Sequence, residues 1–97
     1  MNPKYPFNYL NLSAIYIEDK EYDKAIDILS QGLYNIQHAD LYYNRACCHS
    51  ICGNSDLAVS DLKRAIDLNS NIVEWIEKDK DFDNLRGHKG FKKLTED

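Results

Sequence analysis

The chain has 97 residues, 43% of them apolar, and a formal net charge of -4 at pH 7. That length allows one small domain with a modest hydrophobic core. The acidic balance argues against nucleic acid or an anionic membrane as partners, because both require clustered positive charge, and a protein partner is the remaining expectation.

The first part of the chain predicts two helices joined by a polar turn. Apolar residues recur at three- and four-residue steps across residues 7–17, and charged residues follow at 18–21. A second apolar stripe begins at Tyr22 and ends near Leu33. We therefore expect an antiparallel pair of helices here.

Residues 42–69 repeat residues 9–36 at an offset of 33 positions. Gly53 marks the turn of this second copy, and we expect Asn54 or Ser55 to cap the helix that follows. One such pair is too small to bury its own apolar face, so the two pairs should stack. The matched positions pair Tyr9 with Tyr42, Asn11 with Asn44, Ser13 with Ala46, Ala25 with Ala58, Leu29 with Leu62, Gly32 with Ala65, and Leu33 with Ile66.

This pattern of aromatic and small residues resembles the tetratricopeptide repeat. The residues that carry the resemblance are Tyr9, Leu12, Ser13, Tyr16, Ala25, Leu29 and Gly32 in the first copy, and Tyr42, Ala46, His49, Ala58, Leu62 and Ala65 in the second. The resemblance implies an all-α fold, a right-handed α–α superhelix of two helix hairpins with a C-terminal capping segment. It also implies a non-enzymatic interaction module that needs no cofactor.

We expect a single domain with repeat 1 at residues 6–38, repeat 2 at 39–71, and a degenerate third repeat or cap at 72–97. The offset places Trp75 at the position of Tyr9 and Tyr42. Residues 79–86 resemble the segment that ends many bacterial repeat arrays. The side chains expected to cover the apolar end of the stack are Trp75, Phe82, Leu85, Phe91 and Leu94.

A pair of charged residues replaces two apolar residues in the second copy. Arg45 takes the position of Leu12, and Asp61 takes that of Ile28. A guanidinium group at a helix interface is costly unless it is paired. We predict that Arg45 and Asp61 are partners, an arrangement that resembles an Asn-Arg variant of the family's first helix.

The cluster of Cys47, Cys48, His49 and Cys52 is metal-like in composition. It suggests an alternative function, a metal- or redox-responsive regulatory protein. However, structural zinc sites draw their ligands from two separated segments, so we expect the thiols to be reduced, to pack as small apolar groups and to bind no metal. Neighbours on one helix point apart, so we expect no nucleophile and base, no catalytic residue and no enzyme.

Residues 5–17 contain no charged side chain, although the first helix of a stack should have a solvated face. After the core positions are assigned, an apolar stripe remains that should line the concave side and bind a protein or peptide. Self-association and cover by the chain's own tail are the alternatives. This predicted groove consists of Phe7, Leu10, Ala14, Ile17, Tyr43, Asn44, Cys47 and Ile51.

One class of partner can be tested against the sequence through the resemblance. Repeats that clamp the C-terminal carboxylate of heat-shock chaperones use Lys and Asn on the first helix, Asn on the third, and Lys and Arg on the fifth. Here the five positions are Leu10, Ala14, Asn44, Val73 and Glu77, and only Asn44 fits. Binding of chaperone tails is therefore disfavoured.

The sequence also bears on location. No stretch approaches the roughly 20 consecutive apolar residues that a membrane span needs. The first six residues lack the apolar core of a signal peptide. We expect a cytoplasmic protein.

Overall fold

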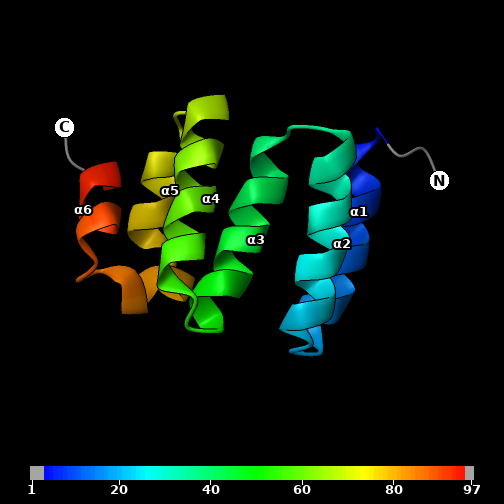
Figure 1. Ribbon diagram of the computed structural model, residues 1–97, viewed down its shortest axis with the longest axis horizontal. Coiled ribbons are helices and arrows are strands. Elements are labelled where there is room, and N and C mark those ends of the chain that lie inside the picture. Colours follow the sequence, from blue (N-terminus) through cyan, green and yellow to red (C-terminus); the bar gives the residue numbers. More distant parts are fainter. Residues whose placement is uncertain (1–3, 96–97) are drawn as a thin grey trace.

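The computed structural model describes residues 4–95, which form a row of helices (Figure 1). The elements are α1 (Pro6–Glu18), α2 (Tyr22–Asn35), α3 (Ala39–Ile51), α4 (Ser55–Leu68), α5 (Ile72–Lys78), the 3-10 helix η1 (Lys80–Leu85) and α6 (Lys89–Thr95). No strand occurs in residues 4–95. The prediction of an all-α fold built from two helix hairpins, α1–α2 and α3–α4, is confirmed.

Small residues are buried where the helices approach each other. Ser13 and Ala46 occupy the same position in the two copies, and both are fully buried. Ala25 and Ala58 are likewise inaccessible to solvent. At Gly32, an added Cβ would lie 2.8 Å from Cγ of Tyr9, closer than packed carbon atoms come. These contacts explain why the repeat restricts side-chain size at these positions.

The turn inside each hairpin has the same backbone structure in both copies. Lys20 and Gly53 stand at equivalent positions, with φ angles of 61° and 83° in the left-handed region. The backbone N–H of Asn54 donates to the carbonyl of His49 at 2.8 Å, as that of Glu21 does to Tyr16. Asn54 is the residue preceding α4, but the predicted side-chain cap is wrong, since neither copy has one there. The backbone bond holds this turn instead.

The predicted pairing of Arg45 with Asp61 is confirmed. Arg45 Nε donates to Asp61 Oδ2 and Arg45 Nη2 to Asp61 Oδ1, both at 2.7 Å. Arg45 Nη1 also donates to Ser30 Oγ on α2 at 3.1 Å, so one guanidinium connects the two repeats. Five donors in a planar fork allow this three-point arrangement.

The third segment differs from the prediction at Trp75. The side chains of Ile72 and Ile76 are fully buried, whereas Trp75 is 44% exposed and does not occupy the core position of Tyr9 and Tyr42. The reason is that α5 has only seven residues and turns a different stripe inward. Phe82, Leu85 and Phe91 lie in the core and Leu94 packs against it. Residues 96 and 97 of this predicted segment lie outside the described residues.

The C-terminal elements pack on the second hairpin, with η1 against α3 and α6 against α4. Figure 1 places α1 and α6 at opposite ends of the row. Within residues 4–95, no helix has the length and apolar character that crossing a membrane requires.

Candidate functional site

Helix α1 forms one wall of the predicted groove. Phe7 is 50% exposed, and its ring meets that of Tyr5 edge-on with 5.3 Å between centroids. Ala14 is exposed, while Leu10 and Ile17 are partly buried because their inner edges pack on the core. This wall therefore presents apolar surface without a charged group.

Tyr43 on α3 joins the predicted groove to the C-terminal segment. Its hydroxyl donates to the carboxylate of Asp79, and its ring lies edge-on to Trp75 and Phe82, at centroid distances of 5.7 and 5.6 Å. Burial and then the hydrogen bond to Asp79 raise the pKa of the phenol well above its ordinary value. Tyr43 thus holds the third segment against α3 as well as facing the groove.

Cys47 lies beneath the residues that follow α5. It is 8% exposed, and its Sγ lies within 4.8 Å of carboxylate oxygens of Asp79 and Asp81. Burial, followed by those two negative charges, raises the pKa of the thiol far above its ordinary value. The thiol is therefore neutral and leaves little surface for a partner.

The other two predicted residues on α3 remain accessible. Asn44 is half-buried, and within residues 4–95 its side-chain amide makes no hydrogen bond. Ile51, in the last turn of α3, is 40% exposed. The structure thus leaves Asn44 and Ile51 open, next to the covered Cys47.

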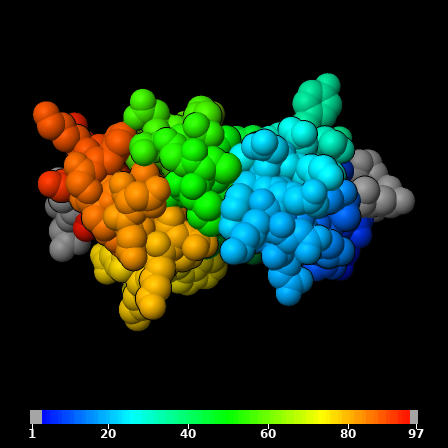
Figure 2. Space-filling model, turned by 90° about the horizontal axis from the view of Figure 1, so that it is seen from below, coloured from blue at the N-terminus to red at the C-terminus, as the bar shows by residue number. Residues whose placement is uncertain are grey.

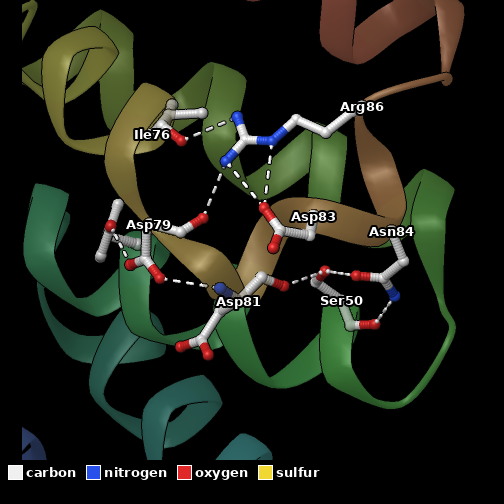
Figure 3. Close-up of polar contacts among 8 residues, drawn as sticks. Ser50, Ile76, Asp79, Asp81, Asp83, Asn84 and Arg86 are labelled. Atoms are coloured by element: carbon white, nitrogen blue, oxygen red, sulfur yellow. Dashed lines mark hydrogen bonds and ion pairs between the residues drawn. The ribbon is translucent and has the colours of Figure 1, made fainter.

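The 3-10 helix η1 covers the C-terminal half of α3, as Figure 3 shows. Ser50 Oγ donates to the carbonyl of Asp81 at 2.6 Å, and Asn84 Nδ2 donates to the carbonyl of Ser50 at 2.7 Å. Arg86 donates to the carbonyls of Ile76 and Asp79 at 3.1 and 2.9 Å. Cover by the chain's own tail therefore applies to Cys47 and Ser50.

Ser50, Asn84 and Arg86 are structural residues that sequence reasoning missed. Arg86 lies within the segment compared with the ends of repeat arrays, and that resemblance was a usable signal. Ser50 and Asn84 carry no such signal, because their contact joins residues that are far apart in the chain.

The molecular surface is indented between the two ends of the stack. Figure 2 shows a notch in the lower outline between the yellow residues of α5 and the blue residues of the N-terminal half. A separate shallow hollow of about 400 Å³ lies at the α2–α3 connection. It is lined by Gln37, His38, Ala39, Asp40, Leu68, Asn69 and Trp75. The exposed ring of Trp75 therefore belongs to this hollow's edge.

The cysteine cluster is not assembled as a metal site. Among residues 4–95, the group of candidate ligand atoms that lie close together is Cys47 with Asp79 and Asp81, without Cys48, His49 or Cys52. The metal or redox alternative therefore finds no support in the geometry.

The other members of the cluster also have unsuitable protonation states. Burial raises the pKa of Cys48 to about 12 and also raises that of Cys52, which leaves both as thiols. His49 fills a buried position, and its Nε2 lies 3.9 Å from Asp61 Oδ2. Burial lowers the pKa of this imidazole.

Comparison with known proteins gives one match. A family model described as a tetratricopeptide repeat matches residues 8–35 and 39–72. These two ranges cover most of both hairpins and reach the first residue of α5. No curated protein and no solved structure matches the chain.

Proposed function

Because this chain belongs to the tetratricopeptide repeat family, we propose that it binds a protein or peptide partner in the cytoplasm through the open part of the predicted groove. Repeats of this family generally mediate protein–protein interactions, and domains built from them are typically non-enzymatic. One copy of the chain suffices for this function, with neither nucleic acid nor membrane involved.

The observation that carries the proposal is the charge-free surface of α1. Phe7 and Ala14 are exposed, and no side chain from residue 5 to residue 17 is charged. Surface of this kind on a small domain generally marks an interaction site. We assign the apolar anchors to Phe7, Leu10, Ala14 and Ile17.

Two residues of α3 complete the proposed site. The side-chain amide of Asn44 can bond a backbone group of an extended or helical segment. Tyr43 presents an aromatic edge beside it. Cys47 contributes little to this surface because the C-terminal segment covers it, and Ile51 extends the surface toward the end of α3.

The test is selection of peptides from a displayed random library on the wild-type chain, followed by binding measurements on two variants. Ala14→Asp places a charge on the proposed surface at an exposed position. Leu57→Asp is the matched control, since Leu57 is 55% exposed on α4. Tyr43→Asp is a poor choice because it also breaks the bond to Asp79.

We expect selected peptides to bind wild type and Leu57→Asp equally, and Ala14→Asp at least about 10-fold more weakly, which corresponds to about 1.4 kcal/mol. Circular dichroism checks that both variants are folded. Peptides that bind Ala14→Asp as well as wild type would contradict the proposed surface, as would failure to select any peptide.

A further inference from the structure

The outer side of α1 lacks the neighbour that covers the matching side of α3. Leu41 and Cys48 on α3 are 0% and 1% exposed. The residues at the same positions one repeat earlier are Asn8, which is partly exposed, and Ile15, which is 56% exposed. In the second repeat this side of the helix packs on α2, and in the first repeat no element of residues 4–95 lies there.

We propose that a second copy of the chain covers this side, with the two α1 helices packed antiparallel about a two-fold axis. We call the residues concerned the outer stripe, which consists of Asn8, Leu12 and Ile15. None of them belongs to the predicted groove. They lie on a different side of α1 from Leu10 and Ala14, given about 100° of rotation per residue. The dimer therefore does not depend on the proposed function.

The charge pattern of α1 favours a copy of itself as the occupant. Because residues 5–17 carry no charge, two copies meet without burying an ionised group. In an antiparallel pair, Lys4 at the start of the helix approaches Glu18 of the partner subunit at the far end. The same contact occurs twice, as a two-fold axis requires.

The opposite end of the stack favours a closed dimer over a filament. There η1 and α6 cover the second hairpin, and Phe82, Leu85 and Phe91 are buried. The C-terminal end therefore offers no matching apolar surface to the outer stripe of another copy. Pairing of two identical N-terminal ends closes after two copies.

The size of the stripe predicts a weak complex. Helix α1 has 13 residues, which corresponds to a length of about 20 Å. A contact along one short helix falls below the area of a standard stable interface. We expect a dissociation constant on the order of 10–100 µM.

The experiment is sedimentation velocity on the full chain from about 5 µM to about 500 µM, a range that spans the expected constant. Three single variants accompany wild type. Ile15→Asp charges the outer stripe, Leu57→Asp changes a residue of matching exposure on α4, and Ala14→Asp changes the proposed partner surface. Circular dichroism at each concentration checks the fold.

We expect wild type, Leu57→Asp and Ala14→Asp to form dimers as concentration rises, and Ile15→Asp to dimerise at least about 10-fold more weakly. If Ile15→Asp does not fold, Ile15→Ser replaces it with the same expected direction. A wild-type chain that stays monomeric throughout would overturn the inference. So would a dimer that survives the change at Ile15, or one that Ala14→Asp abolishes.

The inference and the proposed function fail separately. Loss of peptide binding in Ala14→Asp with an intact dimer supports both. A dimer without selected peptides contradicts only the proposed function, whereas selected peptides on a strict monomer contradict only the dimer.

Discussion

Arg45 on α3 and Asp61 on α4 form a two-point ion pair at positions that Leu12 and Ile28 occupy one repeat earlier. Asp61 is 5% exposed, and the guanidinium is partly buried. The hydrogen bond from Asp61, set against the cost of burial, raises the pKa of Arg45. The second hairpin therefore contains a polar connection at a place where the first has apolar side chains.

Removal of one partner should destabilise the fold strongly. Asp61→Ala leaves the guanidinium partly buried without its carboxylate, and we expect a loss of about 2–4 kcal/mol. The double variant Arg45→Leu/Asp61→Ile restores the residue types of the first repeat and should lie within about 1 kcal/mol of wild type. Urea unfolding followed by circular dichroism measures both. A double variant as unstable as Asp61→Ala would contradict this account.

Gly32 is expected to tolerate no side chain. Alanine normally favours a helix by about 1 kcal/mol over glycine. Here its Cβ would lie 2.8 Å from Cγ of Tyr9, an atom close to the backbone that cannot easily move away. We expect Gly32→Ala to lower the free energy of unfolding by about 1–2 kcal/mol.

Gly87→Ala is the control for this prediction, because no atom lies within 4 Å of an added Cβ at Gly87. It should change stability by less than about 0.5 kcal/mol. Equal effects of the two substitutions in thermal and urea unfolding would show that packing against Tyr9 is not the cause.

His49 should make stability depend on pH. Burial, partly offset by the charge of Asp61, lowers its pKa below the ordinary value of 6.5. The unfolded chain then takes up a proton more readily than the folded one. The contribution of His49 to stability is therefore complete above about pH 6.5 and is lost as pH falls through the folded pKa.

The measurement compares unfolding of wild type and His49→Phe at about pH 7 and pH 5. Between these values, wild type should lose up to about 1 kcal/mol more stability than the variant. The ring of phenylalanine fills a similar volume and needs no partner for Nδ1, which has none among residues 4–95. Parallel pH profiles of the two proteins would refute the assignment to His49.

Cysteine reactivity should separate Cys52 from the other two thiols. Cys52 is exposed, whereas Cys47 and Cys48 are buried. With a disulfide reagent at about pH 8, Cys52 should react in the native chain, and the other two only after unfolding. Its raised pKa should make Cys52 slower than a free thiol.

The variant Cys52→Ser is the control and should show no rapid reaction in the native state. Added zinc should leave the melting temperature unchanged, because the candidate ligands do not converge. A clear rise in melting temperature with zinc would restore the metal alternative.

The sequence predicts the hairpins well because the determining interactions are local or repeated. Helical periodicity sets the stripes, and the offset between copies identifies Ala25 and Ala58 as positions of close approach. The Arg45–Asp61 pair was also predictable, since two charges at core positions require each other. The candidate groove on α1 follows from charge pattern alone, and its use by a partner stays a prediction.

The third segment was less predictable because its course depends on contacts between distant residues. Helix α5 ends before Asp79, whose carboxylate accepts from the backbone N–H of Asp81 at 2.9 Å and from the hydroxyl of Tyr43. Extrapolation of the repeat assumes a longer helix and so placed Trp75 in the core.

By itself, the sequence determined the element types, the repeat length and the small residues between helices, because each of these depends on neighbours one or two turns away or on a repeated position. Only the tertiary structure decided that Cys47 lies covered while Trp75 is open. Both outcomes follow from the direction the chain takes after α5. That direction is set by the hydrogen bonds of Asp79 and Arg86 and by burial of Phe82, which act across the fold.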